Sequence, residues 1–446
     1  MLGDEVFLIG FSRGSFTVRS IAAMICEVGL LTKEGMEHFF EIFDDWEHQL
    51  NLKGTYEQKL FGAPSKVAGD PDYEAGIDFK TKALGRRPDG SPTTLQYATY
   101  ALKLQRKGWT TLEVPIKAIA CFDTVGSLGL PRSGLLAPLT PPNRAYAFVD
   151  TEVLPNVDHC FHALALDEIR KPFSPTLWEL PNPRQGQVLK QCWFPGEHGN
   201  IGGSTDDAEL PNIALAWMTE QLKDMLDFDK SYLRYCSDVN KRYYATAGGA
   251  EIPKLRGWAL GYLIWPVSFP QQIAGQRRRT PGMYFRYNKT TGMPEMDNIM
   301  DASVTHETIH PAARVRFMTP GAGYEDKGSY KATALIGHGY ELEFEAAPKD
   351  HAPHSRELDP TSGPWVWSTN GRKDTEVWQS ILTVFGVRRK LPKPPMPLQE
   401  ETLTGIELMF LEESRLALTQ DFRDLGMLGQ PNWADPQGVG DGREAQ

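Results

Sequence analysis

The fold is decided near the start of the chain, by the stretch Val6-Phe-Leu-Ile-Gly-Phe-Ser-Arg-Gly14. Its first four residues are apolar and run into Gly10, a pattern typical of a strand buried on both faces of a parallel sheet. After Gly14 the apolar residues take the spacing of a helix with one apolar face. The stretch therefore predicts a parallel strand, a sharp turn and a helix, and the helix residues concerned are Phe16, Ile21, Met24 and Ile25.

The turn itself has the sequence G-x-S-x-G, with Ser12 at its centre. Between a buried strand and a helix, this pattern is typical of a nucleophile elbow, in which the serine hydroxyl stands at the carboxyl end of the sheet. The two glycines give the backbone room for such a turn. The alternative is an ordinary strand-to-helix turn whose serine caps the helix. We favour the elbow, which makes Ser12 the first candidate catalytic residue.

The alternation of strands and helices continues along the chain. Residues 112–122 and 188–194 have the composition of strands, and helices are expected at 37–50 and 211–226. The second helix has Pro211 in its first turn, where proline is tolerated. This order indicates an α/β fold, with helices on both faces of a mostly parallel sheet.

Composition limits what kind of protein this is. The 446 residues suffice for two domains or one large one, and 41% hydrophobic with 23% charged residues is an ordinary globular mixture. The net charge of −10 argues against a nucleic-acid partner, because phosphate contacts need a basic face. The dense basic run Arg277-Arg-Arg279 fits a solvated loop as well as a phosphate site.

The cysteines and apolar runs indicate the compartment. The five cysteines are far apart and form no CxxC pair, which suits a reducing compartment and indicates neither a disulfide framework nor a cysteine zinc site. No signal peptide opens the sequence, and the longest apolar stretch, 258–269, is too short to span a bilayer. We expect a cytoplasmic protein with no metal, no cofactor and no transmembrane segment. Peripheral membrane contact and the oligomeric state stay open.

Four regions are expected along the chain. Residues 1–230 carry the α/β core, 231–390 form an irregular α+β region, and 391–429 hold a proline-rich linker and a C-terminal helix. Residues 430–446 are expected to be disordered. The C-terminal helix, expected over 400–425, would line much of one face with Leu403, Ile406, Phe410, Leu418 and Phe422.

A serine at such a turn needs a base and an acid, and α/β hydrolases supply the acid and then the base after it in chain order. Asp123 follows the strand at 112–122, and His198 follows the strand at 188–194 in a glycine-rich loop. Both would lie at carboxyl ends of parallel strands, where catalytic groups gather. The plainer alternatives are an Asx-turn or helix cap for the aspartate and a local hydrogen bond for the histidine. Asp167 is the competing candidate for the acid.

Several blocks of sequence carry a resemblance to a known family. They are Gly10-Phe-Ser-Arg-Gly-Ser-Phe-Thr-Val-Arg19, Phe122-Asp-Thr-Val-Gly-Ser127, His162-Ala-Leu-Ala-Leu-Asp-Glu168, Trp193-Phe-Pro-Gly-Glu-His-Gly-Asn-Ile-Gly-Gly203 and Pro211-Asn-Ile-Ala-Leu-Ala-Trp-Met218. Together they cover about residues 1–225 and resemble the uncharacterised α/β-hydrolase family called domain of unknown function 2235. That family includes the catalytic domains of type VI secretion phospholipase effectors and many fungal proteins, and this chain looks like a fungal-type member.

The resemblance implies a serine-dependent carboxylic ester hydrolase, with an ester or a lipid as the substrate. It matches Ser12 to the family nucleophile, and Asp123 and His198 to its likely partners. A looser likeness to fungal members continues through Arg279-Thr-Pro-Gly-Met283 and through His306-Glu-Thr-Ile-His-Pro311.

One departure from the family concerns the start of the sequence. Family members place several strands and an Asp-Gly-Thr motif ahead of the elbow, whereas here the elbow begins at Gly10. The resemblance therefore implies an N-terminally incomplete sheet, in which residues 6–9 form an edge strand or pair with a later strand. The oxyanion hole would keep the backbone N–H of Arg13 but lack the donor that an earlier loop supplies. Whether the chain as written is active is therefore open.

Two other functions stay open on the sequence. A degenerate or truncated hydrolase fold would serve as a non-catalytic binding protein. The segment His306-Glu-Thr-Ile-His310 matches the H-E-x-x-H pattern of zinc metallohydrolases, which needs both histidines one turn apart on a continuing helix. Pro311 disfavours helical dihedrals at residue 310, so a strand or loop edge with exposed histidines is the preferred interpretation.

Overall fold

A computed structural model describes most of the first 344 residues and two later segments. The described residues are 4–48, 59–61, 82–83, 95–96, 99–125, 151–246, 257–263, 276–287, 294–300, 302–344, 361, 363, 365–369 and 396–412.

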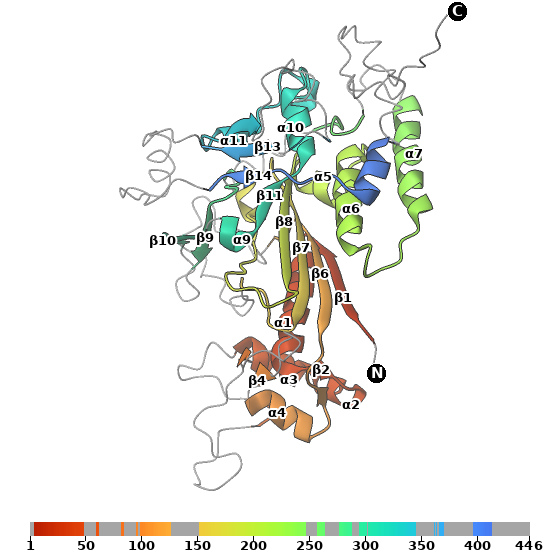
Figure 1. Cartoon of the computed structure of the whole chain (residues 1–446). Helices are drawn as coiled ribbons and strands as arrows, with labels where there is room; N and C mark the ends of the chain where they lie inside the picture. Colours follow the sequence, from red (N-terminus) through yellow and green to blue (C-terminus); the bar gives the residue numbers. More distant parts are fainter. Residues whose placement is uncertain are drawn as a thin grey trace, which may run out of the picture. The chain divides into compact units, whose positions relative to one another are not determined.

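A parallel sheet of five strands lies at the centre of these residues, in the order β1-β6-β7-β8-β11 (Figure 1). In β1 and β6 Phe11 lies opposite Phe122, and in β8 and β11 Cys192 lies opposite Thr308. The sheet confirms the predicted α/β fold, and β1 is its edge strand among the described strands. The strands are β1 (Val6–Phe11), β6 (Ile116–Phe122), β7 (Val157–Ala165), β8 (Val188–Phe194) and β11 (Glu307–Ile309).

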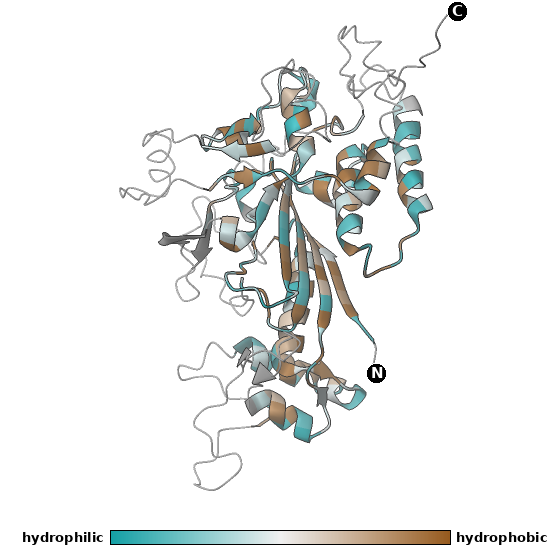
Figure 2. Cartoon of the chain, viewed as in Figure 1, coloured by the Kyte–Doolittle hydropathy of each residue, from teal (hydrophilic) through white to brown (hydrophobic). Residues whose placement is uncertain are grey.

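The helix α1 (Arg13–Val28) packs on β1 and β6. Its residues Ala22 and Ile25 join a hydrophobic core with Ile116 and Ile119 of β6 and with Trp178. Figure 2 shows hydrophobic residues along these strands and on α1. Burial of this shared apolar face holds the strand, the turn and the helix together, which fixes the position of Ser12.

The chain divides into two compact units. The first comprises residues 1–161, 176–190 and 285–298, and the second comprises residues 162–175, 191–284 and 299–446. The division falls within β7 and β8, so each of these strands supplies residues to both units. Ser12 and Asp123 belong to the first unit, whereas Asp167 and His198 belong to the second.

A small helical cluster completes the described part of the first unit. Its core includes Ile42, Trp46, Tyr100 and Leu104, and the buried carboxylate of Asp45 accepts a hydrogen bond from the Tyr100 hydroxyl at 3.0 Å. The elements are β2 (Leu30–Leu31), α2 (Lys33–Met36), α3 (Phe39–Glu47), α4 (Thr99–Arg106) and β5 (Thr110–Thr111), with β2 antiparallel to β5. Two further two-stranded sheets are described. One pairs β3 (Lys82–Ala83) antiparallel with β4 (Leu95–Gln96), and the other pairs β9 (Tyr284–Tyr287) with β10 (Pro294–Met300).

Besides β11 and its parts of β7 and β8, the second unit is mainly helical, with one small sheet of its own among the described residues. Its longer helices are α6 (Glu209–Leu222) and α7 (Lys230–Thr246), which pack against each other. The sheet is antiparallel, in the order β12 (Glu341–Phe344), β13 (Trp365–Ser368) and β14 (Leu398–Gln399). The shorter helices are α5 (His198–Gly202), α9 (Ala302–Thr305), α10 (Pro311–Met318) and α11 (Thr333–Ile336), with short 3₁₀ turns at Lys171–Phe173 and Tyr324–Asp326.

Most predicted elements are confirmed. The strands expected at 6–9, 112–122 and 188–194 are β1, β6 and β8, and β6 begins only after Pro115, which has no N–H for a sheet. Burial of β1 on both faces is wrong, because this edge strand is only half-buried and its Ile9 is 51% exposed. The helices expected at 37–50 and 211–226 are α3 and α6. Strands β7 and β11 go beyond the prediction. Of the C-terminal helix, residues 405–412 are described as helical, and Leu418 and Phe422 lie outside the described residues.

Later segments of the chain contain two sets of residues whose burial or exposure the sequence predicts. Leu403, Ile406 and Phe410 are buried, as the predicted apolar face requires. Arg279 is also buried, so a wholly solvated loop is wrong for the basic run that it ends. The division into four regions at residues 230, 390 and 429 stays a prediction.

Candidate active site

Ser12 lies in the turn between β1 and α1, and its backbone is strained. The dihedral angles are φ 58° and ψ −121°, and such a conformation costs a non-glycine residue about 1–3 kcal/mol. The Ser12 N–H donates to the Phe122 carbonyl at 2.9 Å, which ties the turn to the end of β6. Ser12 occupies the N-cap position of α1, yet its side chain does not cap the helix. The capping alternative for this serine is therefore wrong.

Close packing requires the first glycine of the motif. A Cβ on Gly10 would lie 2.6 Å from the carbonyl carbon of Gly14 and 2.7 Å from the Ser15 nitrogen, so any side chain there would push the turn open. The Ser15 hydroxyl closes the same turn by donating to the Gly10 carbonyl at 2.7 Å. A Cβ on Gly14 would meet nothing within 4 Å among the described atoms, so the second glycine is not required by packing there.

Asp123 lies where the chain leaves the sheet after β6, next to the turn that holds Ser12. It follows β6 directly, and Phe11 and Phe122, the residues just before Ser12 and Asp123, face each other across the two strands. The Val125 N–H approaches the Ser12 carbonyl at 3.4 Å, so the turn after β6 returns to the turn after β1. Asp123 is fully buried and has φ 39°, a second strained position at this end of the sheet. The first unit thus brings two of the candidate residues together.

Arg13 is the first residue of α1. The N–H groups of the first turn of a helix have no acceptor within the helix, and they carry the positive end of its dipole. The Arg13 N–H is therefore suited to stabilise a negative oxygen next to Ser12.

His198 lies in the second unit, where it is the first residue of α5 and is 6% exposed. Its ring meets the Phe173 ring edge to face, with 4.8 Å between centroids. The loop before it turns at Gly196, which has φ 119° and whose Cβ would lie 2.7 Å from that of Asn200. Only glycine fits both restrictions, so the loop that presents His198 depends on it.

Two acidic residues that follow β7 hold this loop. Asp167 accepts from the Gly196 N–H at 2.6 Å, and its own N–H donates to the Gly196 carbonyl at 2.9 Å. The next residue, Glu168, accepts from the backbone N–H of His198 at 3.4 Å. Arg170 then bridges Glu168 and Glu197, at 2.6 Å and 3.1 Å. The backbone on both sides of His198 is therefore fixed from the end of β7.

The Asp167 carboxylate is fully buried and saturated with donors. Besides Gly196, it accepts from the Tyr330 hydroxyl at 2.8 Å and the Tyr324 hydroxyl at 3.2 Å. Burial raises the pKa of Asp167 to about 6, despite these hydrogen bonds and the nearby charge of Arg316. None of its donors among the described residues is an imidazole, in contrast to what the role of a triad acid requires.

The raised pKa of Asp167 predicts how stability depends on pH. Above an unfolded pKa near 3.8 the unfolded chain gives up this proton, while the folded chain keeps it up to about pH 6. The folded state therefore binds more protons in this window, and the free energy of unfolding falls as pH rises. Between pH 4.5 and 7.5 the free energy of unfolding of the wild type should fall by about 2 kcal/mol relative to that of Asp167→Asn, as measured by urea unfolding. If the wild type instead gained stability relative to Asp167→Asn as the pH rose, the raised pKa would be wrong.

The H-E-x-x-H segment is not a zinc site. Glu307–Ile309 is a strand, so His306 and His310 do not lie one turn apart on a helix, and the zinc interpretation is wrong. Glu307 is buried and accepts from the Trp193 indole N–H at 2.9 Å. His310 is buried rather than exposed, accepts from the Ala312 N–H at 3.2 Å and lies 3.1 Å from a Glu407 oxygen. The segment is a strand, as preferred, but this histidine belongs to the core.

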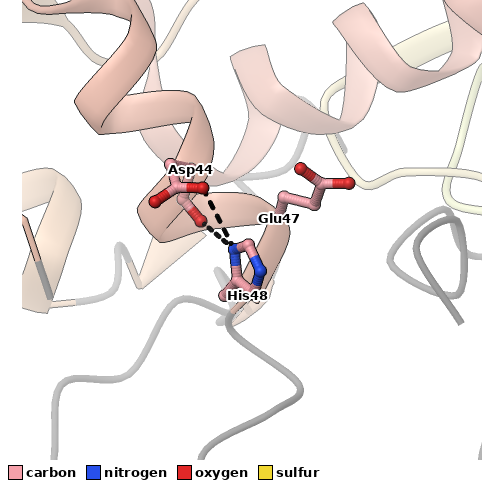
Figure 3. A group of neighbouring side chains, drawn as sticks. All are labelled: Asp44, Glu47 and His48. Atoms are coloured by element: carbon pink, nitrogen blue, oxygen red, sulfur yellow. Dashed lines mark hydrogen bonds and ion pairs between the residues drawn. The ribbon is translucent and has the colours of Figure 1, made fainter. Parts of the chain in front are cut away.

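One group of side chains among the described residues has the spacing of metal ligands. Asp44, Glu47 and His48 on and just after α3 offer ligand atoms within 4.8 Å of one another (Figure 3). The His48 Nδ1 lies 2.8 Å from the Asp44 carbonyl oxygen, and the Lys59 ammonium lies 3.5 Å from the Asp44 carboxylate. Asp44 and His48 are therefore engaged with each other and with Lys59.

The described residues form an α/β fold, with a parallel sheet and a serine on the turn from its edge strand to a helix. Residues 1–221 match the family described as T6SS, phospholipase effector Tle1-like, catalytic domain. The chain belongs to this family. Membership places this part of the chain among lipase- and phospholipase-like hydrolases.

One curated relative is uncharacterized protein YEL023C of Saccharomyces cerevisiae (strain ATCC 204508 / S288c). It is 28% identical over 176 residues, which are 38% of this chain and 18% of the yeast protein. The matched region thus spans under a fifth of that relative. No solved structure matches the chain significantly. None of the helices in the described ranges combines the length and apolar character that crossing a bilayer requires.

Proposed function

We propose that the chain is a serine-dependent carboxylic ester hydrolase of the lipase or phospholipase type, with Ser12 as nucleophile, His198 as general base and Asp123 as acid. The observation that carries the proposal is the backbone of Ser12, at φ 58° and ψ −121° between a parallel strand and a helix. A nucleophile elbow needs this strained turn to expose its serine oxygen. Capping of α1 does not account for the serine, because its side chain makes no capping hydrogen bond.

In the proposed reaction the Ser12 Oγ attacks the carbonyl carbon of the ester while His198 takes the hydroxyl proton. The tetrahedral intermediate then collapses, the alcohol leaves with that proton, and the acyl group stays on Ser12 as an ester. Water attacks this acyl ester in the same way, with His198 taking and returning the proton. Each cycle consumes one ester and one water and releases one alcohol and one acid.

The oxyanion of the intermediate would be stabilised from the N-terminus of α1. The Arg13 N–H, free of any acceptor within its helix, is the donor that follows the nucleophile. A single donor of this kind contributes about 10²–10³-fold to the rate.

Asp123 is the preferred acid for two reasons. It neighbours Ser12 at the carboxyl end of the sheet and is fully buried, so its charge would act in a medium of low dielectric constant. The carboxylate oxygens of the competing residue, Asp167, already accept hydrogen bonds from Gly196, Tyr324 and Tyr330. We therefore assign Asp167, together with Glu168, to positioning the loop that carries His198.

The proposal is tested by a covalent adduct on Ser12. The purified chain should hydrolyse p-nitrophenyl butyrate and a short-chain phosphatidylcholine, and a fluorophosphonate probe should modify the peptide that contains Ser12, as detected by mass spectrometry. Hydrolysis with the adduct on another residue would contradict the role of Ser12. Absence of both hydrolysis and adduct would favour the non-catalytic binding protein.

A further inference from the structure

One face of the helix α7 packs against other described residues. Leu233, Ser237 and Asn240 are buried, and they lie on one face of the helix. Asn240 donates to Glu209 at 3.2 Å and accepts from the Ala208 N–H at 2.9 Å. The inner face of α7 is thus fixed against the start of α6, and residues on the rest of its circumference are exposed and form its outer face.

The outer face exposes large aromatic residues in a row. Tyr232, Tyr235 and Tyr243 are 59%, 55% and 36% exposed, and Val239 between them is 40% exposed. At 100° per residue, these four positions fall within about a quarter of the helix circumference. Three tyrosines and a valine in one exposed stripe are more than scattered surface residues, and such patches mark contact sites.

Basic residues lie next to this stripe, on the side away from the buried face of α7. Arg234 and Arg242 are exposed and Lys241 is half-buried. The three line a shallow hollow together with Ser231, Tyr235 and Asp238, whose carboxylate lies 3.6 Å from the Lys241 ammonium. The Arg242 guanidinium lies 5.8 Å from the centre of the Tyr235 ring. Residues 230–246 contain four basic residues and one acidic residue, Asp238, in a chain whose net charge is −10. The outer face of α7 is therefore a cationic and aromatic surface on an acidic protein.

We propose that this face docks the protein on an anionic phospholipid bilayer. The proposal rests on the proposed function, because a phospholipid ester is presented to an enzyme in a membrane. Tyrosine suits the interface, since its ring enters the headgroup region while its hydroxyl stays in water. Each Arg or Lys adds attraction to anionic lipid, which offsets the repulsion of the acidic remainder. A second copy of the same face would be repelled, because its charge has the same sign.

The test separates binding from hydrolysis by using the full chain with Ser12→Ala. In a co-sedimentation assay this protein should pellet with vesicles of phosphatidylcholine that contain 30% phosphatidylserine. It should stay in the supernatant with pure phosphatidylcholine vesicles. Binding should weaken at high salt, because the attraction between charges is screened. Arg234→Gln and Arg242→Gln should each lower the partition coefficient about fivefold, and Tyr232→Ser with Tyr235→Ser should lower it further.

The matched controls are Lys33→Gln and Arg106→Gln, which remove the same charge from exposed positions on α2 and α4. They should bind as Ser12→Ala alone does, and thermal unfolding should show every variant folded. Equal binding by the α7 variants, or no binding to anionic vesicles, would overturn the docking proposal. A change of sedimentation with α7 substitutions in the absence of lipid would instead assign the face to a protein contact.

Failure of the two proposals can be told apart with Ser12 intact. If p-nitrophenyl butyrate is hydrolysed while vesicles do not bind, the docking surface is wrong and the hydrolase stands. If vesicles bind through α7 while no ester is hydrolysed, the hydrolase is wrong and the docking surface stands. The α7 variants should leave hydrolysis of the soluble ester unchanged and slow only hydrolysis of vesicle lipid.

Discussion

Replacing Ser12 by alanine is expected to abolish ester hydrolysis, with a fall in kcat of about 10⁶-fold, the loss seen when a nucleophilic serine is removed from a comparable triad. The reason is chemical, because alanine has no oxygen on which the acyl group can be carried. The backbone conformation, φ 58°, is one that serine and alanine tolerate about equally. The free energy of unfolding should therefore stay within about 1 kcal/mol of the wild type.

The measurement is initial-rate hydrolysis of p-nitrophenyl butyrate, with circular dichroism and urea unfolding on the same samples. Ser20→Ala is the matched control, since this half-buried serine of α1 donates to the Phe16 carbonyl of its own helix, at 2.9 Å. It should retain wild-type activity. Wild-type activity in the Ser12→Ala protein would refute the elbow interpretation.

The part of the fold that local sequence determines could be predicted closely. The apolar run ending in Gly10 predicts the place of β1 and of its turn, because the turn needs a glycine at that point, although β1 is half-buried rather than buried. The strand at 188–194 has the bounds of β8. In both cases the residues that decide the structure are neighbours in the chain.

The missed strands have polar residues that neighbours in space satisfy. In β7, His159 contacts the Lys117 carbonyl at 3.1 Å and His162 contacts the Gln191 side chain at 3.2 Å. In β11, the Glu307 carboxylate accepts from the Gly282 N–H at 2.9 Å. Without these distant partners the two segments appear too polar for a central sheet, and β11 instead matches a zinc motif.

In the candidate site, too, local sequence predicts some residues, and the contacts of others depend on distant parts of the chain. Ser12, Asp123 and His198 could be proposed because each directly follows a strand. The contacts of Asp167 could not be predicted, because its main partner, Tyr330, is 163 residues away. The roles of Glu168 and Arg170 likewise depend on the loop after β8. The only local signal is an acidic residue two positions before an arginine, which is common on protein surfaces.

The second large effect is expected from Asp123→Asn, which should lower kcat by about 10⁴-fold, as an asparagine in place of the triad acid does in trypsin. The amide would hold the imidazole of His198 in the wrong tautomer and would not stabilise the imidazolium that forms when the Ser12 proton is taken. The substitution keeps the size of a fully buried side chain, so the fold should persist. Fluorophosphonate labelling of Ser12 should slow in proportion to ester hydrolysis.

Asp167→Asn is the matched control for that substitution. An asparagine at residue 167 can accept from the Gly196 N–H with its oxygen and donate to the oxygens of Tyr324 and Tyr330 with its amide. The loop that carries His198 should therefore stay in place, and kcat should fall by no more than about tenfold, the scale of one altered hydrogen bond. Asp167→Ala, which removes the contact to Gly196 altogether, should cost more than Asp167→Asn. If instead Asp167→Asn lost activity as heavily as expected for Asp123→Asn, and Asp123→Asn did not, the acid role would pass to Asp167.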